Sequence, residues 1–150
     1  MMKIKSNLGG DELEKFQEFI FGMDDALERL IAAAAAEGIS LDYSLDSINS
    51  LEILIDIFYG KPGATRNLTR CSSYLGEIFR REIGGHWDLC QDDPRNIYYK
   101  LPVITNFSAI RADFCPIAII ENYITRRRRG LLRGALEVNR EFSNKNKDKK

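Results

Sequence analysis

Four residues in the middle of the chain have side chains that could do acid–base or nucleophilic chemistry: Glu77, His86, Asp88 and Cys90. A thiol needs a neighbouring base or positive charge to become a thiolate at neutral pH, and an imidazole oriented by a carboxylate is such a base. This interpretation makes the protein a small hydrolase with Cys90 as nucleophile and His86 as general base. No spacing signature fixes the distance between the two side chains. The alternative is structural: Glu77 accepts hydrogen bonds from backbone donors, and His86 faces solvent.

A run of arginines is the strongest charge feature of the chain. Arg126, Arg127, Arg128 and Arg129 are consecutive, and Arg133 follows them. Four consecutive residues on a helix spread over most of its circumference, so they cannot all bind one surface. Nucleic-acid phosphates fit such a run, as do the carboxylates of another protein. A third possible partner is the chain's own first helix, with its acidic residues Asp11, Glu12, Glu14, Glu18, Asp24, Asp25 and Glu28.

The formal net charge of zero conceals an asymmetry between the two ends of the chain. Residues 1–60 contain 4 Lys and Arg against 12 Asp and Glu, whereas residues 61–150 contain 18 against 10. This split of −8 and +8 predicts either internal pairing of the halves or two faces of opposite sign. A domain with zero net charge is a poor general binder of nucleic acid, which favours a protein partner.

Composition excludes several other classes of protein. The chain has 150 residues, 44% of them hydrophobic, which is enough for one well-cored domain. Three widely spaced cysteines and a single histidine argue against a disulfide framework and exclude a multi-His metal centre, so we expect no metal and no cofactor. The start lacks the apolar segment of a signal peptide. The longest apolar run, residues 30–36, is too short for a bilayer, and we expect a cytoplasmic protein without a membrane partner.

The first half of the chain is predicted to be helical. Residues 1–10 form a polar lead that we expect to be mobile. Apolar residues at spacings of three and four then predict one long helix over 11–37. A second helix begins with a cap at Asp46 or Ser47 and continues to residue 59, where we expect it to be central and deeply buried. A third helix covers residues 69–83 and ends at two glycines.

The second half is predicted to contain strands and then helix. Short strands are expected at residues 87–89, 97–103 and 107–112, the middle one from its period-two alternation. Pro116 is typical of a helix start, and a last helical piece after Gly130 contains Leu131, Leu132, Leu136 and Val138. Residues 143–150 are predicted to be a disordered basic tail. The expected fold is a single α+β domain over residues 11–142, with three N-terminal helices, a small antiparallel sheet of about three strands, and one or two C-terminal helices.

The joint between the third helix and the first strand contains a recognisable pattern. Its residues are Tyr74, Gly76, Glu77, Gly84, Gly85 and Trp87, in the order Tyr-Leu-Gly-Glu…Gly-Gly-x-Trp. With Asp42-Tyr43-Ser44 before it and Asp113-Phe114-x-Pro116 after it, the pattern resembles a family of small bacterial proteins of unknown function, over roughly residues 42–128. Such proteins lie, in some genomes, near toxin and secretion loci, so the resemblance implies an immunity role. It implies no catalytic residues.

Three functions are therefore predicted from the sequence. The first is a non-enzymatic partner-binding protein, an immunity protein that neutralises a cognate bacterial toxin through the charged face of Arg126–Arg129 and Arg133. The second is a nucleic-acid-binding protein that uses the same arginine run, with affinity that falls steeply with salt. The third is the small hydrolase with a Cys90 and His86 site.

Overall fold

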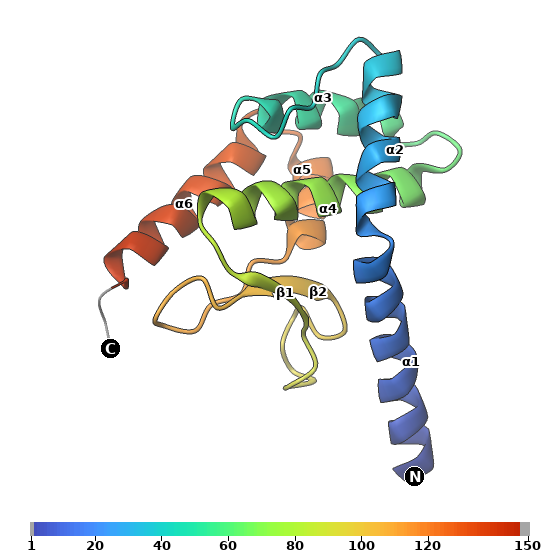
Figure 1. Cartoon of the computed structure of the whole chain (residues 1–150), viewed down its shortest axis with the longest axis vertical. Helices are drawn as coiled ribbons and strands as arrows, with labels where there is room; N and C mark the ends of the chain where they lie inside the picture. Colours follow the sequence, from blue (N-terminus) through green and yellow to red (C-terminus); the bar gives the residue numbers. More distant parts are fainter. Residues whose placement is uncertain (1, 148–150) are drawn as a thin grey trace.

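The structure is a computed structural model that describes the backbone of residues 2–147 and the side chains of residues 11–147 (Figure 1). Within this range the chain is mostly helical and carries one small antiparallel sheet. No helix in it is both long enough and apolar enough to cross a membrane. The elements are α1 (Met2–Phe21), α2 (Met23–Ala36), α3 (Ser47–Phe58), α4 (Ala64–Glu82), β1 (His86–Leu89), β2 (Pro102–Thr105), α5 (Pro116–Arg126) and α6 (Leu131–Lys145).

The predicted long N-terminal helix is in fact two helices, which makes four helices before the sheet instead of three. Gly22 lies between them at φ −91° and ψ 6°. The hydrogen bonds from Gly22 N to Glu18 O and from Ala26 N to Gly22 O persist, at 2.9 and 3.0 Å. The apolar period therefore continues through the junction while the axis bends, as glycine permits. Because α1 begins at Met2, residues 2–10 belong to a helix; their mobility stays a prediction.

Helix α4 occupies the middle of the molecule, between α2, α3 and α5 (Figure 1). Its residues 71–76 are all buried, and they include the small polar pair Ser72 and Ser73. Short side chains let neighbouring helices approach, and the Ser72 hydroxyl is satisfied by donating to the Thr69 carbonyl at 2.6 Å. The prediction that α3 is deeply buried is correct for one face, with Leu51, Leu54 and Ile55 inaccessible to solvent, while Ile53 is 47% exposed. The core therefore centres on α4.

The sheet has two strands, not three. β1 and β2 pair antiparallel with Trp87 opposite Ile104. The predicted strand over 107–112 is wrong: that segment forms bends, and the ladder extends only through an isolated bridge between Ile104 and Phe114. Phe107 packs its ring edge-to-face on Phe79, at 4.9 Å between centroids, instead of extending along the sheet. The predicted strand over 97–103 is also wrong for residues 97–100, which form turns.

The joint after α4 depends on the glycines of the sequence pattern. Gly85 has φ +90°, and a Cβ there would lie 2.6 Å from the Thr105 carbonyl oxygen. A Cβ at Gly76 would overlap the Trp87 ring, so the glycine lets the indole lie directly against α4. The indole Nε1 of Trp87 donates to Glu77 Oε2 at 2.8 Å. The residues of the pattern therefore form a close contact between α4 and β1, in which the Trp87 ring packs on Gly76 and is hydrogen-bonded to Glu77.

Two helices, α5 and α6, follow the sheet, within the predicted one or two. The second of them ends later than expected. α6 continues to Lys145, into the segment from residue 143 that was predicted to be disordered. Ser143 is buried, and its hydroxyl donates to the Phe107 carbonyl at 2.7 Å; Asn146 is buried too. The predicted disorder from residue 143 onward is therefore wrong for 143–146, and residues 148–150 lie outside the described residues.

Candidate functional site: an arginine-rimmed hollow

The arginine run is a turn between two helices. α5 ends at Arg126, and Arg127 has left-handed backbone angles, φ 53° and ψ 36°, with its N–H bonded to the Tyr123 carbonyl. Gly130, at φ 90°, then precedes the first residue of α6, Leu131. The assumption that the four arginines lie around one helix is therefore wrong. Because the chain reverses here, the arginine side chains diverge into two groups.

One group, Arg127 and Arg129, binds Asp56 of α3, although both side chains stay partly exposed. Arg127 Nη1 lies 2.8 Å from Asp56 Oδ1, and the guanidinium of Arg129 contacts Asp56 Oδ2. The Tyr123 hydroxyl donates to Asp56 Oδ1 at 3.0 Å and accepts from Arg129 Nη1 at 2.9 Å. Burial, together with the hydrogen bond to Asp56, raises the pKa of Tyr123 to about 12. A single carboxylate thus holds two of the four cations.

Glu52, one turn before Asp56, caps α6. Its side chain is 1% exposed, and its two oxygens accept from the N–H groups of Gly130 and Leu132, each at 3.0 Å. A carboxylate at a helix N-terminus satisfies unpaired donors and favours the helix dipole. The acidic and basic halves of the chain therefore meet at α3, not at the acidic first helix as one interpretation had it. Glu52 was not among the predicted site residues, although its spacing from Ile48 and Ile55, which puts it on the apolar face of α3, was a signal for it.

The second group borders a hollow between α5 and α6. The hollow has a volume of about 520 Å³. Part of its lining is apolar, and the polar side chains of the lining are arginines and asparagines. Among the described residues, no Asp or Glu side chain lines it. The residues that line it are Ile119, Asn122, Arg126, Arg128, Arg129, Gly130, Leu131, Gly134, Ala135, Val138 and Asn139.

Two arginines of this lining, Arg126 and Arg128, form no ion pair with an acidic side chain of the described residues. Both Arg126 and Arg128 are exposed. The Arg126 Nε donates to the neutral Asn122 Oδ1 at 2.8 Å, and no hydrogen bond or ion pair of the described residues involves the Arg128 side chain. A guanidinium binds a carboxylate or phosphate through two parallel hydrogen bonds. The hollow can therefore hold an anionic group beside an apolar one.

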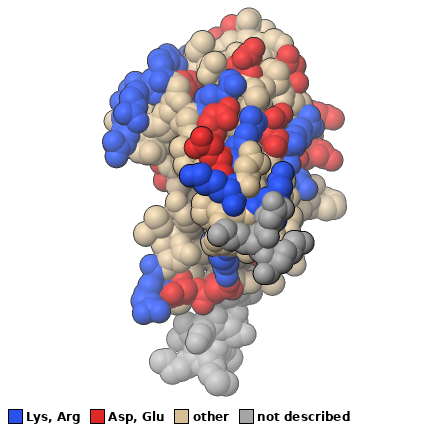
Figure 2. Space-filling model, turned by 90° about the vertical axis from the view of Figure 1, so that its left-hand side faces the viewer, with Lys and Arg blue, Asp and Glu red and all other residues tan. Residues whose placement is uncertain are grey.

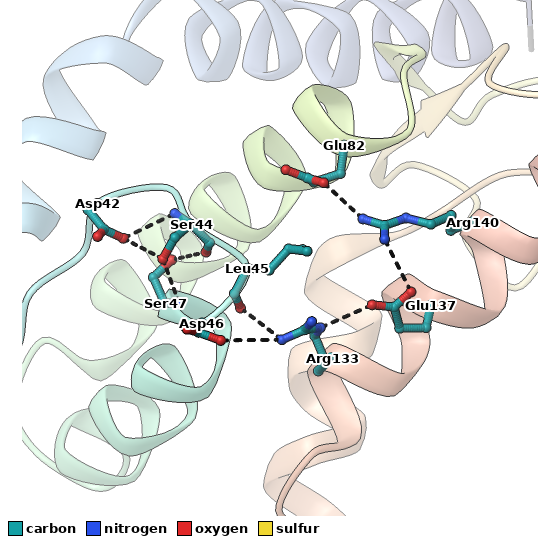
Figure 3. A network of polar contacts seen from close by, with 9 residues as sticks. All are labelled: Asp42, Ser44, Leu45, Asp46, Ser47, Glu82, Arg133, Glu137 and Arg140. Atoms are coloured by element: carbon teal, nitrogen blue, oxygen red, sulfur yellow. Dashed lines mark hydrogen bonds and ion pairs between the residues drawn. The ribbon is translucent and has the colours of Figure 1, made fainter.

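Arg133, the fifth predicted binding residue, is outside this hollow. It belongs to a network that joins α6 to the loop before α3 and to the end of α4 (Figure 3). Its Nε lies 3.1 Å from Glu137 Oε2 and its Nη1 lies 3.8 Å from Asp46 Oδ1. Arg140 extends the network to Glu82 at 2.9 Å. Arg133 is thus engaged internally, and a binding role for it stays a prediction.

The same view corrects the predicted cap of α3 (Figure 3). The side chains of Asp46 and Ser47 accept no backbone N–H at the start of α3, contrary to the expectation. Instead, the Ser47 N–H donates to Ser44 Oγ at 3.2 Å, and the Ser44 hydroxyl donates to Asp42 Oδ1 at 2.6 Å. The Ser47 hydroxyl is 2.8 Å from the Tyr74 hydroxyl, which also accepts from the Tyr43 N–H. The Tyr74 hydroxyl therefore links α4 to the loop before α3 through hydrogen bonds.

The hydrolase interpretation lacks its geometry. His86 is exposed on β1, whereas Cys90 is 5% exposed and packs with Val103 and Cys115. Burial raises the pKa of the Cys90 thiol, and the nearby Asp113 raises it further. No hydrogen bond of the described residues joins the imidazole to the thiol. Glu77 binds Trp87 and Arg80, so it does not orient His86.

Charges of both signs cover the side of the molecule that carries α6. Figure 2 shows Lys and Arg interspersed with Asp and Glu over much of this face, with one separate group of basic side chains at the upper left. Ion pairs such as Arg140–Glu82 account for part of the mixing. This face is therefore not a continuous basic stripe.

Comparison of the chain with models of protein families, with curated proteins and with solved structures found no match. The resemblance to the small bacterial family accordingly stays a prediction. Among the described residues, His, Cys, Asp and Glu form no group of three or more that could hold a metal ion. The function is therefore inferred from the hollow itself.

Proposed function

We propose that the protein is a non-enzymatic partner-binding protein whose hollow takes an acidic, partly apolar segment of another protein. The observation behind this proposal is that Arg126 and Arg128 border a partly apolar lining that contains no carboxylate. A carboxylate of the partner would bind the guanidinium groups, and a neighbouring apolar side chain would cover Leu131, Ala135 and Val138. Arginines next to apolar surface are typical of the energetically dominant parts of protein interfaces.

A protein partner is favoured over nucleic acid for two reasons. Asp56 already binds Arg127 and Arg129, so only two cations of the run remain for phosphates. Acidic side chains are interspersed on the face with α6 (Figure 2), and the net charge is zero. Non-specific affinity for nucleic acid scales with the number of phosphates neutralised, and two contacts give a weak complex.

A toxin domain with an acidic surface is the partner that fits the family resemblance. An immunity protein blocks its toxin by covering a functional surface, which requires affinity and shape but no catalysis. The small size of this chain and the charged hollow agree with that task. The proposal therefore extends to neutralisation of a cognate toxin.

The test compares the unaltered chain with a hollow variant and a matched control. The variant is Arg126→Glu with Arg128→Glu; the control is Lys61→Glu with Arg66→Glu, which makes the same charge change at exposed positions around the start of α4. Each protein is used to capture partners from a nuclease-treated host lysate at about 0.15 M salt. A captured protein is identified and purified, and its affinity for the three chains is measured by calorimetry.

The expected result is that the unaltered chain and the control bind the purified partner, while the hollow variant loses at least about tenfold in affinity. Equal affinity for all three chains would refute the proposed site. Capture that depends on nucleic acid, with affinity falling steeply with salt, would instead favour the nucleic-acid interpretation.

A further inference from the structure

The most exposed large hydrophobic residue of the described chain is Phe21, with 94% of its surface accessible. It is the last residue of α1, directly before the bend at Gly22. Other apolar residues of the same helix, Leu13 and Ile20, are 39% and 38% exposed. A single exposed apolar residue is ordinary on protein surfaces, so the meaning of Phe21 depends on what surrounds it.

Phe21 is surrounded by carboxylates in the sequence. Glu18 and Glu14 precede it by three and seven residues, which puts all three on one side of α1. Asp24 and Asp25 follow at the start of α2. These four acidic side chains are exposed. Asp25 is paired with Arg29 at 2.8 Å, so the end of α1 presents an aromatic ring with the carboxylates of Glu14, Glu18 and Asp24 beside it.

This end of α1 is chemically complementary to the hollow. The hollow has an apolar lining that includes Val138, 67% exposed, and its volume of about 520 Å³ admits an aromatic ring. Its free charges, Arg126 and Arg128, are positive, whereas those beside Phe21 are negative. An aromatic anchor in a pocket with paired charges at its rim is a common arrangement of strong interface contacts.

Phe21 cannot fill the hollow of its own molecule. α1 packs against α2 and β1, whereas the hollow lies between α5 and α6. Figure 1 places α1 and α2 on one side of the molecule and α6 on the opposite side. The contact must therefore join two molecules.

We infer that the hollow of one copy of this chain binds Phe21 and the adjoining carboxylates of a second copy. This inference rests on the proposed function, because it assigns an occupant to the same hollow. The two surfaces differ, so the contact is heterologous, and successive copies either close into a ring or continue as a chain. Self-association then competes with the protein partner for the hollow.

Sedimentation equilibrium of the full chain, at concentrations up to about 1 mM, tests the inference. The unaltered protein should associate reversibly, and association should weaken as salt is raised. Phe21→Ala should weaken it at least about tenfold. Ile97→Ala is the matched control, since Ile97 is an 83% exposed hydrophobic residue on the loop between β1 and β2, and it should leave association unchanged. Neither side chain is buried, so both variants should fold.

A charge exchange makes the test specific. One variant carries Arg126→Glu and Arg128→Glu, the other Glu14→Lys and Glu18→Lys. Each alone should remain monomeric, because the first variant puts negative charges in both the hollow and the helix end, and the second puts two lysines opposite Arg126 and Arg128. An equimolar mixture should associate, since both contacts regain opposite charges. A mixture that stays monomeric would overturn the inference.

The failure of this inference and that of the proposed function can be told apart. Phe21→Ala should still bind the purified partner, whereas Arg126→Glu with Arg128→Glu should not. An unaltered chain that remains monomeric at every concentration, yet binds its partner through the arginines, would overturn self-association and leave the proposed function in place. Loss of partner binding in Phe21→Ala would also count against the inference, because Phe21 would then face the partner.

Discussion

Glu52 of α3 accepts a hydrogen bond of 3.0 Å from the backbone N–H of Leu132 in the first turn of α6, 80 residues later in the chain. Its second oxygen accepts from the Gly130 N–H. A buried carboxylate is costly unless its oxygens are satisfied, and here the helix start supplies the donors. The position of α6, and with it one wall of the hollow, therefore depends on Glu52.

Replacing Glu52 should destabilise the protein. Glu52→Gln keeps the shape but puts an amide NH₂ against one of the two N–H donors and removes the charge that favours the helix dipole. We expect a loss of about 1–3 kcal/mol in the free energy of unfolding, measured by urea denaturation. Glu121→Gln, at an exposed position of α5, should change it little. Equal stability of the two variants would contradict the capping role.

Gly76→Ala should destabilise the joint between α4 and β1. Alanine gains about 1 kcal/mol in helix propensity over glycine. Its Cβ, however, would overlap the Trp87 ring, which Phe19 and Glu77 hold in place. We expect overpacking to outweigh propensity and leave a net loss of about 1 kcal/mol or more.

Two variants control this prediction. Gly134→Ala lies in α6 with nothing within 4 Å of the new Cβ, so it should stabilise the protein by up to about 1 kcal/mol. In a Trp87→Phe background, Gly76→Ala should cost less, because phenylalanine lacks the ring atoms that overlap. A double-mutant cycle isolates that coupling, and additive effects would contradict the proposed contact.

Tyr123 should make the stability fall in alkali. The pKa of its hydroxyl is raised from 10.0 to about 12, so between these values the folded protein retains a proton that the unfolded chain has lost. Its contribution to stability is therefore complete below pH 10 and is lost as pH rises toward 12. Denaturation across this range, compared with Tyr123→Phe, should show a smaller slope in the variant. An unchanged slope would indicate that Tyr123 titrates normally.

The cysteines should react slowly in the folded protein. All three are buried, and burial raises the pKa of each thiol, for Cys115 to about 11. Because the thiolate is the reactive species, alkylation near neutral pH should require unfolding. Mass spectrometry of samples alkylated with and without denaturant checks this expectation. Rapid modification of native Cys90 would revive the hydrolase interpretation.

Local sequence signals predicted most of the helices. Pro116 marks the start of α5, and Gly84 with Gly85 follows the end of α4. These signals are reliable because they act within a few residues, through backbone angles and terminal hydrogen bonds. The bend at Gly22 was missed because the apolar period is unbroken across it.

The sheet and the site depend on contacts between distant residues. Alternation over 97–103 predicted a strand, but Asn96 Oδ1 accepts from the Tyr98 N–H at 2.8 Å and Lys100 adopts φ 74°, so the chain turns instead. Asp56 binds Arg127 across 71 residues. Residue types predicted that the arginines carry function, but only this pairing determines which of them stay free.

The only tryptophan of the chain, Trp87, lies where α1 meets the body, with the Phe19 ring edge-to-face on it at 5.2 Å between centroids. Its indole is therefore a built-in optical reporter of the N-terminal arm. Detachment of α1 would expose the indole ring to water and shift its fluorescence emission to longer wavelength. Movement of α1 can therefore be followed without attaching a dye.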